Sequence, residues 1–293
     1  MSDRRRTNTT LGLYTSTASD ASGTVIRRYS TSFGAAARML EPGIRRRIRD
    51  IYALVRIADE IVDGAAAEAG LAADELLDIL DELERETETA MRRGYSANIV
   101  VHAFAVTARE CGIEPSLTRP FFASMRRDLD DSPFTAEEIG PYIHGSAEVV
   151  GLMCLRAFFA GETIEPARRA ALDEGAIHLG AAFQKVNFLR DAAVDYRTLG
   201  RNYFPWLDPT RMTDVEKHAI LDDIDADLRI AADSLPLLPR SARPAVTAAH
   251  GLFRRLSTKL RKTPAAELLT RRVRVPDSEK LIIAARSALG GRP

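Results

Sequence analysis

Two segments of this chain combine apolar surroundings with a pair of aspartates four residues apart. The first pair is Asp59 and Asp63, and the second is Asp191 and Asp195. Residues four apart lie on the same face of an α-helix, one above the other. Most other positions of both segments are apolar, which is typical of buried helices. Because an unpaired buried charge is very costly, the fold must provide each pair with a cation or a hydrogen-bond donor.

Hydrophobic residues recur with the helical period along almost the whole chain, and no segment alternates as a β-strand would. Proline and glycine separate the periodic segments. Pro141, Gly145 and Gly151 lie inside one of them, so that helix is expected to bend. The predicted helices cover residues 24–40, 44–64, 71–93, 96–111, 115–131, 135–160, 165–196, 213–234, 240–262 and 276–289.

The chain has 293 residues, of which 45% are hydrophobic and 28% charged, and this composition suits a globular protein with a large core. No linker rich in glycine, serine or proline divides it. We therefore predict one all-α domain over residues 23–293, built as a single large helical bundle. Residues 1–22 are polar and rich in serine and threonine, and they are expected to be mobile.

Charge composition excludes one class of partner and leaves another open. Basic and acidic residues both number 41, so the formal net charge is zero and nothing favours nucleic-acid binding. Two basic clusters, residues 45–49 and 254–274, can be solvated helix faces or contacts with anionic lipid headgroups. Cys111 and Cys154 lack metal-ligand spacing and suit a reducing compartment, so we expect a cytoplasmic protein. We expect no signal peptide and no segment with the ~18 apolar residues that span a bilayer.

Other acidic stretches have a simpler interpretation. Residues 71–93 carry many carboxylates together with an apolar stripe, which is typical of a surface helix. Asp128, Asp130 and Asp131 lie at the end of a predicted helix and are expected to form a solvated terminus.

Helical geometry places further polar side chains beside both aspartate pairs. At about 100° per residue, each pair shares an arc of roughly 60° to 80° with two neighbours. These sets are Tyr52, Arg56, Asp59 and Asp63 in one segment, and Gln184, Asn187, Asp191 and Asp195 in the other. One pair alone would be explained by an ion pair such as Arg56 with Asp59. Two matched sets favour a cage for hard divalent cations such as Mg²⁺, which act on phosphate or diphosphate.

The same segments resemble the motifs of the squalene/phytoene synthase family, the head-to-head branch of the trans-isoprenyl diphosphate synthases. The similarity extends from about Tyr29 to about Leu289, and bacterial phytoene synthases are the most similar members. Glu148 and Lys185 depart from the family pattern, and neither replaces a metal ligand. The matching segments are 29–33, 51–63, 142–151, 187–205 and 271–276.

The resemblance implies an isoprenoid synthase fold with a central active-site cavity and a prenyltransferase of the 15-cis-phytoene synthase type. Such an enzyme joins two geranylgeranyl diphosphates head to head to phytoene, via a cyclopropylcarbinyl (prephytoene) diphosphate, in carotenoid biosynthesis. The implied cofactor is Mg²⁺, with Mn²⁺ as a substitute, and no NADPH is expected. Two alternatives stay open. One is a squalene or dehydrosqualene synthase that uses two farnesyl diphosphates, and the other is a non-catalytic relative that acts in assembly.

The resemblance also implies roles for individual residues. The implied metal ligands are Asp59, Asp63, Asn187, Asp191 and Asp195. The implied catalytic residues are Tyr52, Arg56, Tyr142, Arg190 and Tyr203. Substrate binding is implied for Ser30, Ser32, Phe33, Arg56, Tyr142, Gln184, Asn187, Arg190 and Arg201. The apolar product favours peripheral contact with the inner face of the membrane, and the sequence does not define an oligomeric state.

Overall fold

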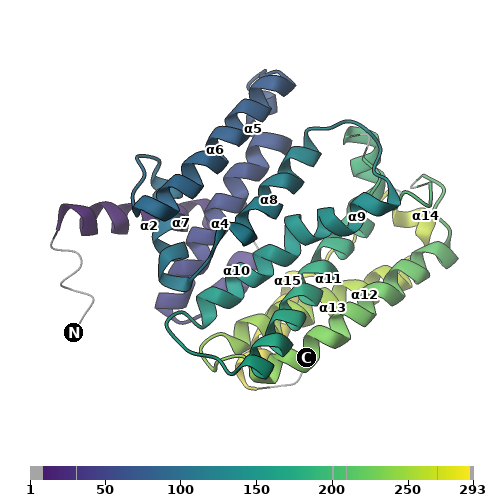
Figure 1. Ribbon diagram of the computed structural model, residues 1–293. Helices are drawn as coiled ribbons and strands as arrows, with labels where there is room; N and C mark the ends of the chain where they lie inside the picture. The colour runs from purple at the N-terminus through teal and green to yellow at the C-terminus, as the bar shows by residue number, and fades with distance from the viewer. Residues whose placement is uncertain (1–8, 31, 200, 209, 269, 291–293) are drawn as a thin grey trace.

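The computed structural model describes residues 9–290 apart from 31, 200, 209 and 269, and leaves out the side chains of residues 32, 33, 35 and 193–199. The described residues form helices and connecting loops without any strand, which confirms the predicted all-α fold (Figure 1). None of the described helices has the length and apolar character needed to cross a bilayer.

The first half of the chain is organised around helix α4. This helix packs against α2, α6, α7, α8 and α10, and its Ile48, Ile51 and Leu54 are fully buried. The pattern of buried positions follows the helical period that the sequence shows. The helices of this half are α2 (Thr10–Tyr29), α3 (Ser32–Ala37), α4 (Pro42–Asp63), α5 (Ala65–Glu68), α6 (Ala73–Arg93), α7 (Ile99–Cys111) and α8 (Pro115–Asp128).

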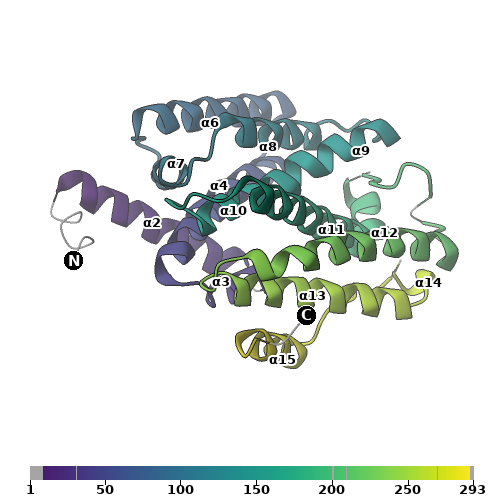
Figure 2. The same cartoon turned by 60° about the horizontal axis from the view of Figure 1, so that its bottom comes forward.

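The second half is organised around the long helix α11. This helix packs along α12 and also contacts α10, η1 and α13, while α15 lies outermost on α13 (Figure 2). Its core includes Val186, Leu189, Leu221 and Ile224. The elements are α9 (Ala136–Ile143), the π-helical segment η1 (His144–Glu148), α10 (Val149–Phe158), α11 (Pro166–Leu199), α12 (Asp214–Ser234), the 3₁₀ turn η2 (Leu235–Leu237), α13 (Arg243–Lys262), α14 (Ala265–Leu268) and α15 (Asp277–Ala288).

The N-terminal region differs from the sequence-based expectation. Helix α2 begins at Thr10, within the segment that was expected to be mobile, and residues 1–8 lie outside the described residues. Ala18 and Ile26 are buried, and α2 packs against α4 and α7. Tertiary packing of this kind supplies the stability that a serine- and threonine-rich helix lacks on its own. The predicted helix 24–40 is also divided, because the backbone is extended at Ser30.

The predicted helix 135–160 is interrupted by the π-helical segment η1. A Cβ atom on Gly145 would lie 2.1 Å from the Pro120 carbonyl oxygen, so η1 approaches the backbone of α8 very closely. A Cβ atom on Gly180 would lie 2.8 Å from the Ala147 carbonyl oxygen, so α11 approaches η1 in the same way. Glycine at both positions therefore allows η1 to lie between α8 and α11. A π-helical turn inside a helix often occurs at a functional site.

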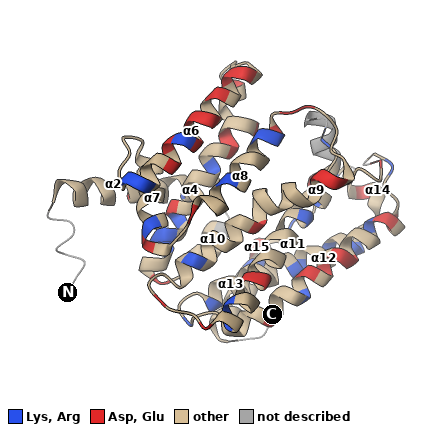
Figure 3. Ribbon diagram, viewed as in Figure 1, with Lys and Arg blue, Asp and Glu red and all other residues tan. Residues whose placement is uncertain are grey.

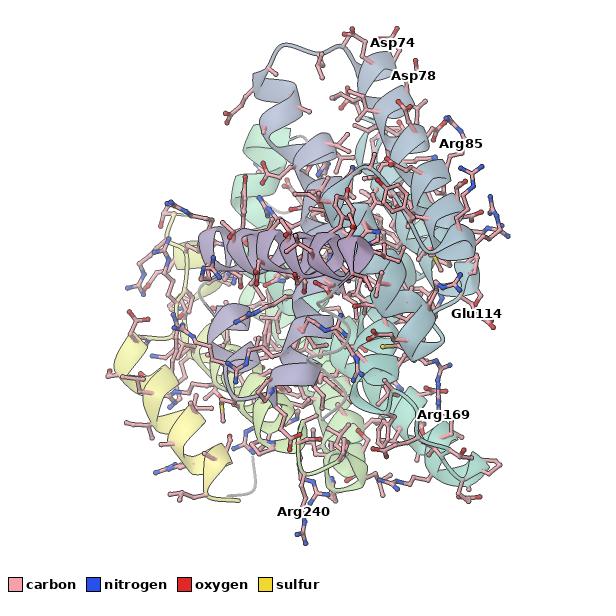
Figure 4. The ribbon with its side chains drawn as sticks, turned by 90° about the vertical axis from the view of Figure 1, so that its left-hand side faces the viewer. Asp74, Asp78, Arg85, Glu114, Arg169 and Arg240 are labelled. Atoms are coloured by element: carbon pink, nitrogen blue, oxygen red, sulfur yellow. The ribbon has the colours of Figure 1, made fainter. Side chains whose placement is uncertain are left out.

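Charged side chains lie mainly on the outer helices. Helices α6 and α12 carry many of them, whereas α10 carries almost none (Figure 3). Asp74, Asp78 and Arg85 of α6 point away from the bundle, as expected for a surface helix (Figure 4). Among the described residues, the buried carboxylates are Asp50 of α4, Asp128 of α8 and Asp227 of α12.

Candidate active site

A polar cavity lies between α4 and α11, and the members of both predicted sets whose side chains are described line it. Asp59 and Asp63 reach it from α4, and Asn187 and Asp191 reach it from α11. The side chain of Asp195 lies outside the described residues. The other lining residues are Tyr52, Val55, Arg56, Phe121, Met125, Asp128, Tyr142, Ser146, Gln184, Phe188, Arg190 and Tyr203.

Three aspartates of the two predicted pairs have described side chains, Asp59, Asp63 and Asp191, and each of them is paired with arginine. Arg56 donates to Asp59 with 2.7 Å between Nη1 and Oδ2, and Arg201 Nη2 lies 2.7 Å from Asp63 Oδ1. Asp191 receives two guanidinium groups: Arg190 Nε donates to it at 3.0 Å, and Arg272 Nε lies 2.8 Å from its Oδ1. Each of these three carboxylates therefore has a guanidinium partner, and Arg56 and Arg190 also line the cavity.

Asp128 is a fourth carboxyl in the cavity, and sequence analysis placed it wrongly at a solvated helix end. Its side chain is buried, and it accepts a hydrogen bond of 2.6 Å from the Tyr142 hydroxyl. Arg201 Nη1 lies 3.7 Å from its Oδ1. Asp130 and Asp131 are exposed, as expected. The sequence contains no local signal for the burial of Asp128, because that burial depends on α9 and the segment after α11.

Burial in the cavity wall changes the acidity of two carboxyls. It raises the pKa of Asp128 to about 7, although the Arg201 guanidinium acts in the opposite direction. It also raises the pKa of Asp59 to about 6, with Arg56 opposing and Asp63 adding to the shift. Burial beside Asp128 raises the pKa of the Tyr142 hydroxyl as well. A cation in this cavity would favour the ionised forms of both carboxyls.

Aromatic rings form one wall of the cavity. The rings of Phe188 and Tyr203 are stacked with their centroids 3.9 Å apart, and Tyr142 is stacked beside Tyr203 at 5.8 Å. Tyr52 lines the cavity from α4. Such faces can stabilise a cation that forms nearby.

An apolar cavity adjoins the polar one. Val55 and Ser146 line both. From there the apolar cavity follows α11 past Phe183, Ala176 and Leu172. Asn187 and Leu172 are about 22 Å apart along the helix axis at 1.5 Å per residue. The two cavities together can hold an elongated molecule with a charged head and a hydrocarbon tail.

Some residues implied by the resemblance lie outside these cavities. Ser30 hydrogen-bonds to the Tyr52 side chain and accepts from the Gly34 amide at 3.2 Å, so it can act only through its neighbours. Arg201 reaches the site through Asp63 and Asp128 without being part of the lining described above. The side chains of Ser32 and Phe33 lie outside the described residues.

The two departures from the family pattern face away from the polar cavity. Lys185 forms ion pairs with Asp223 and Asp227 of α12, at 2.5 Å and 2.8 Å. Glu148 is bonded to His144 Nδ1 at 2.8 Å within η1. Both side chains thus have partners on the scaffold, and neither lines the polar cavity.

The donor set suits Mg²⁺ bound together with a diphosphate. Among the described residues, no three carboxylate, histidine or cysteine side chains converge as a metal cage. Mg²⁺ commonly takes one or two protein carboxylates and completes its shell with water and substrate phosphates. Arg56 lines the cavity, and its Nε is buried without a hydrogen-bond acceptor among the described residues. Phosphate oxygens would provide that acceptor.

Comparison with known proteins identifies the family of this chain. A model of the squalene/phytoene synthase family matches residues 26–279. Phytoene synthase 3 of Zea mays chloroplasts is 29% identical over 282 residues, which cover 89% of this chain and 63% of the maize protein. The 15-cis-phytoene synthase of Paracoccus sp. is 27% identical over 253 residues, which cover 81% of this chain and 80% of that protein. The phytoene synthase of Mycobacterium tuberculosis is 26% identical over 280 residues, which cover 89% and 87%.

Solved structures share the fold. A dehydrosqualene synthase in complex with a ligand has a TM-score of 0.78 at 20% identity and covers 94% of this chain and 97% of its own. A squalene synthase of Alicyclobacillus acidocaldarius has a TM-score of 0.68 at 17% identity and covers 85% and 95%. The chain therefore belongs to the squalene/phytoene synthase family and has the all-α isoprenoid synthase fold. The relatives named phytoene synthase come from plants as well as bacteria.

Proposed function

We propose that this protein is a prenyltransferase that condenses two prenyl diphosphates head to head. The observation that carries the proposal is the junction of two cavities at Val55 and Ser146. The polar cavity would hold the diphosphates, and the apolar cavity would hold a prenyl tail. Family membership supports this chemistry, and the paired carboxylates and arginines supply groups that it needs.

The reaction would begin with loss of a diphosphate from an allylic carbon. Mg²⁺, when bound, would supply Lewis-acid stabilisation of the departing diphosphate. Asp59, Asp63, Asn187 and Asp191 would hold the metal, together with Asp195, whose role rests on the resemblance alone. Arg56, Arg190 and Arg201 would donate forked hydrogen bonds to the phosphate oxygens. Gln184 lies beside Asn187 and Asp191 in the lining and would orient the same group.

The aromatic wall would protect the carbocation left behind. Water would destroy an allylic cation, so the reacting carbons must lie in a dry environment. Four aromatic residues line the polar cavity, namely Phe188, Tyr203, Tyr142 and Tyr52. The Tyr142 hydroxyl donates a hydrogen bond to Asp128, and it would exchange a proton with a group in the cavity.

We further propose that the substrate is geranylgeranyl diphosphate and the product 15-cis-phytoene. Relatives named phytoene synthase support the longer substrate. The depth of the apolar cavity along α11 suits a long tail, and burial of a C20 tail could contribute on the order of 10 kcal/mol at about 0.8 kcal/mol per buried methylene. The enzyme would then act in carotenoid biosynthesis and need no NADPH.

Incubation with Mg²⁺ and either C15 or C20 diphosphate, with and without NADPH, tests this proposal. We expect phytoene from the C20 substrate, independent of NADPH and dependent on Mg²⁺. A C30 product from the C15 substrate, with none from C20, would instead assign a squalene or dehydrosqualene synthase. Absence of any product from either substrate, with protein that is folded and binds Mg²⁺, would favour a non-catalytic relative.

A further inference from the structure

The outer face of α15 is an exposed apolar stripe. Leu281, Ile282 and Leu289 are 71%, 53% and 88% exposed, and Ala285 and Ala288 between them are exposed too. These five positions share an arc of about 120°. Single exposed apolar side chains are ordinary, whereas a continuous stripe on an outermost helix indicates a contact surface.

A cationic pocket adjoins the N-terminal end of α15. It lies between the last turns of α13 and the segment that precedes α15, and no carboxylate is among its described lining residues. The basic side chains that line it are Arg255, Lys259, Lys262, Arg271, Arg272 and Arg274.

The cations of this pocket outnumber the acidic partners that they have among the described side chains. Glu279 lies 2.6 Å from Arg255 and 3.0 Å from Lys259. Glu267 pairs with Arg271 at 2.8 Å, and Asp191 pairs with Arg272. Among the residues whose side chains are described, these three carboxylates pair with four of the six cations, so the described charges of the pocket leave an excess of positive charge.

Three arginines of the other basic cluster, residues 45–49, have partners within the protein. Arg46 and Arg47 pair with Glu110 of α7, and Arg46 also lies 3.4 Å from Asp50. Arg45 donates to the Leu40 carbonyl at 2.8 Å. Of the two clusters for which the sequence left lipid contact open, the one at α13 and α15 is the better candidate.

Helix α13 separates this surface from the apolar cavity. Ala245, Val246 and Ala249 of α13 line the cavity. Two residues beyond Ala249, Ile283 of α15 packs on Gly251, where a Cβ atom would lie 3.1 Å from the Ile283 Cγ2. The apolar stripe thus lies one helix away from the space proposed for the hydrocarbon tail.

We propose that the α15 stripe and the adjoining cationic pocket dock this protein on a bilayer that contains anionic phospholipid. Leu281, Ile282 and Leu289 enter the boundary between headgroups and acyl chains, as an interfacial amphipathic helix does. The pocket binds lipid phosphate, because clustered Lys and Arg are attracted to an anionic surface. The purpose of docking rests on the proposed function, since a hydrocarbon product leaves for the membrane. The docking itself does not depend on catalysis.

Sedimentation with vesicles tests the surface. Wild-type protein and three variants are mixed with phosphatidylcholine vesicles that contain or lack phosphatidylglycerol. One variant combines Leu281→Glu with Ile282→Glu, and another combines Lys262→Glu with Arg274→Glu. Leu77→Glu is the matched control, because Leu77 is a 39% exposed leucine of α6 on the opposite side of the molecule (Figure 2).

The wild type and the control are expected to bind the phosphatidylglycerol vesicles and to be released by salt. Each double variant is expected to lower the partition coefficient by about tenfold or more, with an unchanged melting temperature. Wild-type binding that is absent, that is equal on neutral vesicles, or that persists in both double variants would overturn the proposal. So would a wild-type dimer in light scattering that the Leu281→Glu, Ile282→Glu variant dissociates, because a second copy would then cover the stripe. Turnover of substrate in detergent reports separately on the proposed function.

Discussion

At the scale of single residues, the buried carboxyl of Asp128 has the most unusual surroundings in the site. It accepts a hydrogen bond of 2.6 Å from the Tyr142 hydroxyl, and Arg201 Nη1 lies 3.7 Å from it. Burial raises its pKa to about 7 from a normal value of 3.8. A carboxyl with a raised pKa binds more protons in the folded state than in the unfolded chain. Its contribution to stability is therefore fully present below about pH 4 and is lost as the pH rises to about 7.

Asp128→Asn tests this protonation behaviour without a large change in shape. We expect the free energy of unfolding of the wild type, minus that of the variant, to decrease between about pH 4 and pH 7 and to stay constant above. At about 1.4 kcal/mol per pKa unit, the decrease is at most about 4 kcal/mol. Urea unfolding of both proteins across this range, without divalent metal, measures it. Parallel curves would show that the carboxyl titrates normally.

A site residue could be predicted from the sequence only where one helix fixes its position relative to the other site residues. Tyr52, Arg56 and Asp59 could be grouped from sequence because a single helix fixes their relative directions. Asp128 and Arg272 could not be grouped with them, since each reaches the site through contacts between distant segments. Arg272 contacts Asp191 across a separation of 81 positions. Helical periodicity carries no information about such a contact.

At the scale of elements, the π-helical segment η1 determines the shape of the site. It carries Ser146, which lines the cavity together with Tyr142 at the end of α9, and Ser146 donates to the Tyr142 carbonyl at 2.7 Å. The sequence predicts an interruption in this helix from Pro141, Gly145 and Gly151. It does not predict the π-helical form, because that form follows from the close packing of α8 and α11 on either side.

Gly145→Ala tests the close approach of η1 to α8. The new Cβ atom would lie 2.1 Å from a backbone oxygen, so the helices must separate, and overpacking of this kind costs about 1–3 kcal/mol. Gly140→Ala is the matched control, because a Cβ atom there meets nothing within 4 Å. The control is expected to be neutral or to gain up to about 1 kcal/mol from helix propensity. Denaturant unfolding measures both, and equal stability of the two variants would contradict the packing.

The side chains of α11 that line the apolar cavity are expected to limit the length of the substrate tail. Ala176 lines the apolar cavity about 16 Å along the axis from Asn187. We expect Ala176→Leu to lower kcat/KM for the C20 diphosphate by about tenfold and to affect the C15 diphosphate less, because the shorter tail ends nearer to Asn187. Ala170→Leu changes an exposed position of the same helix and serves as the control. An equal loss for both substrates would show that the tail does not follow α11.

At the scale of the whole molecule, two groups of helices meet along the active site. One group surrounds α4 and the other surrounds α11, and each has its own hydrophobic core. The helical class and most of the long helices follow from periodicity with proline and glycine breaks. The position of α2 did not follow, because its order depends on packing against α4 and α7 rather than on its own composition. The cavities could not be predicted from periodicity either, since they are formed only when both groups of helices are assembled.

The central claim is that α4 and α11 together hold a diphosphate through a divalent metal. The most direct measurement is calorimetric titration of inorganic diphosphate, with and without Mg²⁺, into the wild type, Asp59→Ala, Asp191→Ala and Asp78→Ala. Asp78 is the control, because it lies on α6 and points to the outside (Figure 4).

We expect Mg²⁺-dependent binding to the wild type and to Asp78→Ala. We expect binding that is weaker by about tenfold or more in Asp59→Ala and in Asp191→Ala, because each removes a carboxylate oxygen from the metal shell. Circular dichroism confirms that the variants are folded. Binding to the wild type that is independent of Mg²⁺, or binding to both site variants as tight as to the wild type, would contradict the claim.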